Sequence, residues 1–127
     1  VRFMFERDTG GASQAKTMYY THGGGGNSPV TRGVIKSNRR QEAVVADFFV
    51  TGHTHTEYRV PRPQARLYEQ CNLVVVKTHN WQLGTYKNDF MSGGWADSKE
   101  FPPPNIGCRM VKFTVRNKMV DFISWFV

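Results

Sequence analysis

Alternation of apolar and polar residues predicts strands at both ends of the chain. At the amino-terminal end Val1, Phe3 and Phe5 recur at every second position, which is the period of a strand with one buried face. The turn-forming stretch DTGG follows, and KTMYYTH predicts the returning strand of a hairpin. At the other end CRMVKFTV and MVDFISWFV, separated by a turn at residues 117–118, predict a closing hairpin.

The middle of the chain predicts a strand–helix–strand unit. The stretch NRRQEAVVA (residues 38–46) predicts a helix that Asn38 caps, with residues 43–45 on its buried side. DFFVTG (residues 47–52) is a short continuous apolar run, which is typical of a strand buried on both faces. Residues 16–51 therefore predict a strand, a loop, a helix and a second strand.

Two further strands are expected before a long loop. EYRVPRPQARLYEQ begins as a strand, and Pro61 and Pro63 place it at a sheet edge or in a turn. NLVVVKTH predicts another buried strand, and residues 88–107 predict a surface loop. The fold class expected for residues 1–127 is α/β, on the border with α+β. One domain would hold a mixed sheet, one main helix and a carboxyl-terminal hairpin.

Three apolar runs end in the same dipeptide, Thr-His. MYYTH ends at His22, FFVTGHTH reaches His53 and His55, and VVVKTH ends at His79. In open α/β sheets ligands bind beyond the carboxyl ends of the strands, so neighbouring parallel strands would bring these histidines to one edge. In an extended segment His53 and His55 would point to the same side. Imidazoles gathered in this way suit a transition metal, although polar strand ends without a metal are an equally open interpretation.

The motifs YTHG and GHTH, in this order and across a loop and a helix, resemble the last signatures of the calcineurin-like metallophosphoesterases. The resemblance covers residues 18–58 clearly and extends loosely to the closing hairpin. It implies that His22 and His53 bind the second metal of a binuclear site and that His55 binds the first. Three further residues are candidates to support these ligands: His79, Thr54 and Asp47.

The resemblance also exposes a gap. That family clamps a phosphate ester between two divalent metals, here expected to be Mn, Zn, Fe or Ni. Its amino-terminal signatures, Asp-x-His, Gly-Asp-x-x-Asp and Gly-Asn-His-Asp/Glu, do not occur in this sequence. Without a bridging carboxylate two dications repel each other, so a single ion is expected. The resemblance therefore implies half of a metallophosphoesterase-type β-sandwich, with weak or no hydrolysis of phosphomonoesters or phosphodiesters when it is alone.

Half of a sandwich would leave the apolar faces of FFV, LVVV and FISWFV exposed. We therefore expect a partner, which is either a second copy in a homodimer or a complementing amino-terminal half. Two other functions stay open: a non-catalytic dimeric relic that binds one metal, and a basic nucleic-acid-binding module. The net charge of +7, from 17 basic and 10 acidic residues, suits phosphate esters or nucleic acid as partners.

The glycine run between the first two motifs has two interpretations. Its four residues are Gly23, Gly24, Gly25 and Gly26. Successive backbone N–H groups in such a loop can bind an anion, whereas a flexible linker is the alternative.

Cysteine usage predicts a cytoplasmic location for the chain. Cys71 and Cys108 lack the spacing of a zinc ribbon and are too few for a disulfide framework, so both are expected to be reduced and half-buried. No leader pattern occurs, and no apolar run approaches the roughly 18 residues that a membrane helix needs.

Overall fold

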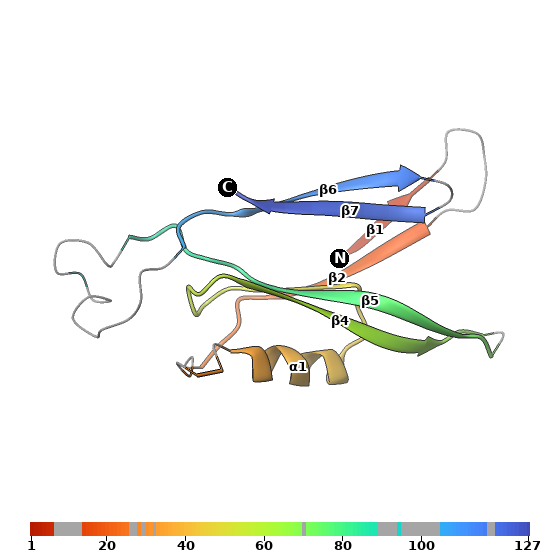
Figure 1. The fold of residues 1–127 in the computed structure, drawn as a ribbon, viewed down its shortest axis with the longest axis horizontal. Helices are drawn as coiled ribbons and strands as arrows, with labels where there is room; N and C mark the ends of the chain where they lie inside the picture. Colours follow the sequence, from red (N-terminus) through yellow and green to blue (C-terminus); the bar gives the residue numbers. More distant parts are fainter. Residues whose placement is uncertain are drawn as a thin grey trace.

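The fold is a mixed α/β arrangement, as the sequence predicts. The computed structural model of the chain describes residues 1–6, 14–25, 28, 30–31, 33–69, 71–88, 94, 105–116 and 119–127. The elements, in chain order, are β1 (Arg2–Phe5), β2 (Gln14–Thr21), α1 (Val34–Ala43), β3 (Phe48–Thr51), β4 (Tyr58–Leu67), β5 (Leu73–Gln82), β6 (Arg109–Arg116) and β7 (Met119–Phe126). Figure 1 shows three layers, with the β6–β7 hairpin on one face of the main sheet and α1 on the other.

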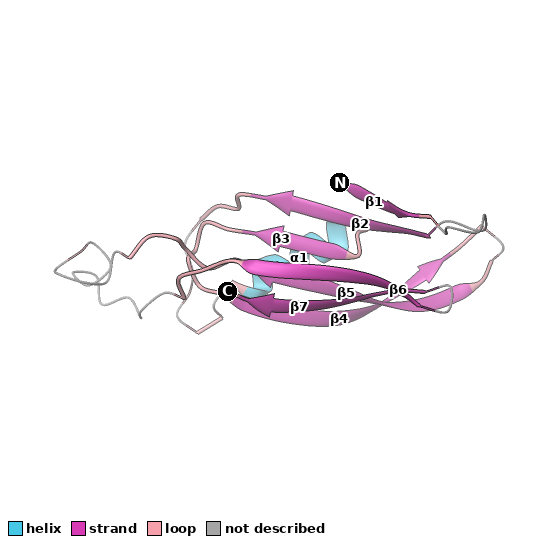
Figure 2. Ribbon diagram, turned by 90° about the horizontal axis from the view of Figure 1, so that it is seen from above, coloured by secondary structure: helices cyan, strands magenta, loops and turns pink. Residues whose placement is uncertain are grey.

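The main sheet has the strand order β1-β2-β3-β5-β4. β2, β3 and β5 are parallel neighbours, whereas β1 and β4 run antiparallel to them at the two edges. Figure 2 shows β1, β2 and β3 side by side. The expected strand–helix–strand unit is confirmed, and so is the edge position of the strand that contains Pro61 and Pro63. Proline lacks the N–H group that an inner strand must donate on one of its sides.

An aromatic core joins the sheet to the hairpin. The ring of Phe48 lies 5.6 Å from that of Phe113 and 4.9 Å from that of Phe122, measured between centroids. Phe49 points to the opposite face of β3 and is only 1% exposed. β3 is therefore buried on both faces as predicted, and the expectation that FFV forms an exposed face is wrong. The reason is that the chain's own hairpin covers this part of the sheet.

The helix lies earlier in the chain than its sequence pattern indicates. α1 begins at Val34, after Gly33 in the left-handed conformation (φ 82°), and no side chain caps it. Asn38 lies inside the helix, so its predicted capping role is wrong. Val45, expected on the buried side, is 70% exposed. Glycine adopts positive φ without steric cost, and this allows the helix to start where a strong polar cap is absent.

Polar residues make up the buried side of α1. Ser37 and Gln41 are its buried positions. The Gln41 amide donates to the Thr78 hydroxyl at 2.8 Å, and the Ser37 hydroxyl lies 2.7 Å from that of Tyr58. The predicted apolar side at residues 43–45 is therefore wrong. Side-chain hydrogen bonds to β4 and β5 hold the helix in its place.

β5 reverses the predicted pattern of burial. Leu73 and Val75, in the apolar run, are each 69% exposed, whereas residues 78–82 are buried. Figure 1 shows the ribbon of β4 and β5 extending beyond α1. On β7 the outward-facing Ile123 and Trp125 are 61% and 44% exposed. The prediction that LVVV and FISWFV expose apolar surface is therefore confirmed for these residues.

Both cysteines are free, as expected. Cys108 is half-buried, but Cys71 is exposed, because it lies in the turn between β4 and β5. In the part of the chain that the structure describes, no helix has the length and apolar character needed to cross a membrane.

Candidate metal centre

The carboxyl ends of three parallel strands form one edge of the sheet. Thr21 of β2 is level with Thr51 of β3, and Thr51 is level with Gln82 of β5. The residues that follow these strands therefore leave the sheet side by side. His22 follows β2 directly, and His53 follows β3 after a single glycine. The expectation that parallel neighbours bring these two motifs to one edge is confirmed.

The two imidazole rings are in contact. Nε2 of His22 lies 3.1 Å from Nδ1 of His53, and the ring centroids are 5.1 Å apart in an edge-to-face arrangement. Both side chains are exposed. Their backbones are joined as well, since the N–H of Gly52 donates to the carbonyl of His22 at 3.2 Å. This backbone bond holds the two Cα positions in register and therefore holds the rings near each other.

The bend after β3 is not an extended segment. His53 and His55 both have positive φ, at 74° and 55°. The left-handed conformation is unfavourable for residues other than glycine, by roughly 1–2 kcal/mol each, and it is concentrated at functional sites. The expectation of an extended segment, in which both side chains would point to the same side, is therefore wrong in its backbone conformation. After this turn the ring of His53 lies against that of His22.

A residue from β5 supports this bend. The Gln82 amide nitrogen donates to the carbonyl of Gly52, and its oxygen accepts a 2.8 Å hydrogen bond from the hydroxyl of Thr51. Gln82 is only 5% exposed. Gln82 is not among the predicted site residues, because the apolar run that predicts this strand ends at His79. The only signal for Gln82 is that it pairs with Thr51 across β3 and β5, and this pairing is known only from the strand register.

The separation of the two nitrogens fits a shared metal ion. Two nitrogen ligands at about 2.0–2.1 Å from one ion are about 3.3–3.4 Å apart at a tetrahedral angle, and about 2.9 Å apart at a right angle. The observed 3.1 Å lies between these values. It also suits a hydrogen bond between two neutral rings. A proton and a metal would therefore compete for the same space between His22 and His53.

Within the described ranges of the chain, no third ligand joins the pair. Among the described residues no group of three or more His, Cys, Asp or Glu side chains is arranged to hold a metal ion. His55 is exposed in its left-handed turn. Its role as a ligand therefore stays a prediction from the resemblance.

His79 lies in the core and not at the edge. It is inside β5, level with Phe48 at the start of β3, and it is 4% exposed. Its ring lies 4.5 Å from that of Phe122 and 5.9 Å from that of Phe48. Burial, followed by the charges of Arg59, Lys77 and Lys16, lowers the pKa of His79 to about 4. The third Thr-His run therefore does not end a strand, and His79 is a neutral core residue at pH 7.

The carboxylate of Asp47 lies at the opposite end of β3 from the histidine pair. It accepts hydrogen bonds from the N–H and hydroxyl of Thr17 at 2.7 and 3.0 Å, and from Arg66 at 3.1 Å. The structure thus does not bring Asp47 to His22 and His53. Nearer in sequence, Glu57 pairs with Arg109 of β6. Both carboxylates already have a guanidinium partner.

The glycine loop that follows His22 lines a small cavity between α1 and the strand ends, and one of its carbonyls binds a side chain of α1. Gly23 and Gly25 have positive φ, at 87° and 74°. The carbonyl of Gly24 accepts a 3.0 Å hydrogen bond from the ammonium group of Lys36. Gly26 lies outside the described residues, so the four-glycine anion loop is described only in part.

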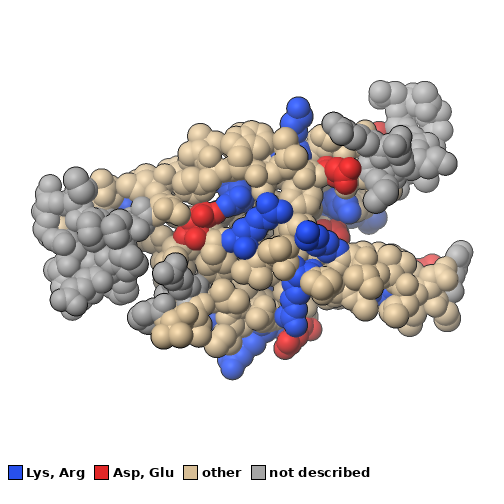
Figure 3. Space-filling view, in the orientation of Figure 1, with Lys and Arg blue, Asp and Glu red and all other residues tan. Residues whose placement is uncertain are grey.

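Comparisons of this chain with models of protein families, with curated proteins and with solved structures found no match. Inference about function therefore starts from the geometry of the edge and from its charge. Figure 3 shows Lys and Arg side chains gathered toward the middle of one face of the molecule, with acidic side chains beside them.

Proposed function

We propose that this chain is a metallophosphoesterase-type domain that binds one divalent ion between His22 and His53. The observation that carries the proposal is the 3.1 Å separation of two imidazole nitrogens at the adjacent ends of parallel strands. This is the place where α/β sheets bind ligands, and the motifs that meet there are the two that resemble the family. Zn, Mn, Fe and Ni are the ions that imidazole ligands suit.

The residues around the pair suit a site at which a phosphate ester can approach. Both rings are exposed, and Gln82 holds the bend from beneath. A divalent ion bound there would act as a Lewis acid toward a phosphoryl oxygen and would lower the pKa of water. Asp47 and Glu57 are paired with Arg66 and Arg109, so they do not supply the carboxylate that a second ion needs. We therefore propose that hydrolysis by this chain alone is weak or absent.

Exposed apolar strands support a partner for this domain. Ile123 and Trp125 lie on the outer face of the hairpin, and Leu73 and Val75 lie on the extended ribbon of β5. Apolar surface of this kind usually marks an interface. A complementing half that carries carboxylates would cover it and complete a binuclear centre. A second copy of this chain would cover it and add only histidines.

Titration calorimetry with Zn²⁺, Mn²⁺ and Ni²⁺ tests the proposed ion site. We expect one ion per chain, and His22→Ala and His53→Ala should each weaken binding at least roughly tenfold, because each removes one of two ligands. His55→Ala makes the same change in the same turn, and unchanged affinity in this variant would show that His22 and His53 hold the ion without His55. Failure of the unsubstituted chain to bind any of the three ions would refute the proposal.

Hydrolysis of a chromogenic phosphodiester with added Mn²⁺ separates the catalytic domain from the non-catalytic relic. We expect turnover to be low and to depend on His53. Complete absence of turnover together with tight metal binding would favour the relic. Binding of nucleic acid that is unaffected by His22→Ala and His53→Ala, without any bound metal, would favour the basic binding module.

A further inference from the structure

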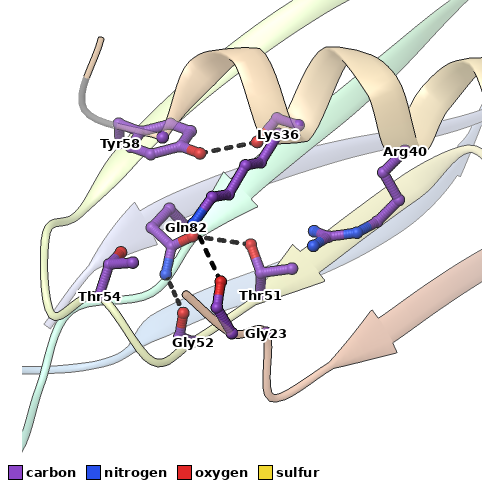
Figure 4. A pocket seen from close by; sticks show the side chains of 11 residues that line it. Gly23, Lys36, Arg40, Thr51, Gly52, Thr54, Tyr58 and Gln82 are labelled. Carbon is purple, nitrogen blue, oxygen red and sulfur yellow. Dashed lines mark hydrogen bonds between the residues drawn. The ribbon is translucent and has the colours of Figure 1, made fainter. Parts of the chain in front are cut away.

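A small cavity lies between α1 and the carboxyl ends of the strands. Lys36 and Arg40 extend into it from α1, and Figure 4 shows their side chains directed toward the strand ends. Thr54, Tyr58 and Gln82 contribute polar walls on the other sides. No acidic residue lines the cavity among the residues that the structure describes. Lys36 and Arg40 are therefore the charged residues among the described lining of the cavity.

The guanidinium of Arg40 lacks a counter-charge. Arg40 is half-buried, and in the described part of the chain its side chain forms neither a hydrogen bond nor an ion pair. The neighbouring Arg39 is exposed to water. A partly buried cation that faces a second cation is costly unless an anion is bound between them. Arg40, which has no counter-charge among the described residues, therefore favours an anionic ligand, and Lys36 from the same helix lines the same cavity.

A buried hydroxyl completes the lining. The Oγ1 atom of Thr54 is buried and has no hydrogen-bond partner, although its own N–H donates to the carbonyl of Gly52 at 3.0 Å. Buried polar atoms without a partner are rare in folded proteins and often mark a missing ligand or water. The hydroxyl of Thr54 can donate to an anionic oxygen in the cavity.

The size of the cavity limits how an anion can enter. Its volume is about 20 Å³, which is room for roughly one water molecule or one oxygen atom. A tetrahedral oxyanion would therefore place one oxygen inside, near Thr54. Its other oxygens would remain at the mouth, within reach of Lys36 and Arg40. The backbone of Gly23 and Gly52, which adjoins the histidine pair, lines the same cavity.

We propose that this cavity is a binding site for a phosphate group, held by Lys36, Arg40 and the hydroxyl of Thr54. The site requires no metal and stands on contacts separate from those of His22 and His53. A substrate bound at the histidine pair would place a neighbouring phosphate here. Phosphate could come from a terminal monoester or from an internal diester of a polynucleotide, and both present the same anionic oxygens.

Nuclear magnetic resonance titration of the whole chain in EDTA tests the site. The probes are methyl phosphate and dimethyl phosphate, at constant ionic strength. Arg40→Gln and Lys36→Gln should each weaken binding roughly tenfold, because each removes a charge-assisted hydrogen bond. Arg39→Gln is the matched control, since it makes the same charge change on the exposed side of the same helix, and it should change affinity less than about twofold.

Two further variants keep the test decisive. Arg40→Lys retains the charge and should retain part of the affinity, which separates a local effect from misfolding. His53→Ala should leave phosphate binding unchanged while it abolishes metal binding, so the two proposals can fail independently. Tighter binding of methyl phosphate assigns a terminal phosphate, and tighter binding of dimethyl phosphate assigns a diester. Equal weakening by Arg39→Gln, weakening by His53→Ala alone, or no binding of either probe would overturn the proposal.

Discussion

Replacing His79 by leucine should remove most of the acid sensitivity of the fold between pH 7 and pH 5. His79 packs between Phe48 and Phe122, is 4% exposed, and has a pKa lowered from 6.5 to about 4. Between these two values the unfolded chain binds a proton at His79 that the folded chain does not. The contribution of neutral His79 to the free energy of unfolding is therefore present in full well above pH 6.5. It is lost as the pH decreases from 6.5 toward 4, and the loss levels off below pH 4.

The size of this effect follows from the two pKa values. Linkage predicts a loss of about 2 kcal/mol in the free energy of unfolding between pH 7 and pH 5, and about 3 kcal/mol by pH 3. Leucine has a similar volume and cannot bind a proton. It also removes a buried Nδ1 that has no hydrogen-bond partner, so little stability should be lost at pH 7.

Urea unfolding followed by tryptophan fluorescence at pH 7 and pH 5 measures the effect, because Trp81 is only 3% exposed and lies beside Phe48. The informative quantity is the pH-dependent loss in the unsubstituted chain minus that in His79→Leu. Other titrating groups are common to both chains and cancel. Parallel pH dependence in the two chains, within about 0.5 kcal/mol, would show that His79 titrates normally and that the core is open to water.

Two other substitutions test the polar contacts. Asp47→Asn should lower the free energy of unfolding, measured by chemical denaturation, by about 2 kcal/mol, because the carboxylate bonds to Thr17 and Arg66. The control is Asp121→Asn, which should change the free energy of unfolding by less than about 0.5 kcal/mol, because Asp121 is exposed and has no partner in the described part of the chain. Gln82→Leu should cost about 1–3 kcal/mol, because it leaves the buried Thr51 hydroxyl without its acceptor and removes one of the two hydrogen bonds to the Gly52 carbonyl, and it should weaken zinc binding roughly tenfold. Gln64→Leu, which makes the same change on β4, is the control, and calorimetry measures the zinc affinity of both variants. Equal zinc affinity of Gln82→Leu and Gln64→Leu would contradict a positioning role for Gln82.

The elements that the sequence predicted well are those whose signal is local. Period-two alternation identified β1 and the closing hairpin, and the prolines identified β4 as an edge. The helix start was missed because Gly33, and not a polar side chain, begins it. Burial along β5 was missed because four of the residues 78–82 are polar, and hydropathy does not reveal that Gln41, Arg62 and Thr51 bond to that segment.

The candidate site likewise has features that the sequence determined and features that it did not. The sequence by itself determined that a histidine would follow β2 and that a glycine and a histidine would follow β3, since each of these strands is a short apolar run. Only the tertiary structure decided that His22 meets His53 and that His79 lies in the core, because strand register and the left-handed bend set these positions. It also brought Lys36, Arg40 and Thr54 around one cavity. Residues on a helix and a distant turn become neighbours only when the helix packs against the sheet, and no local pattern encodes that packing.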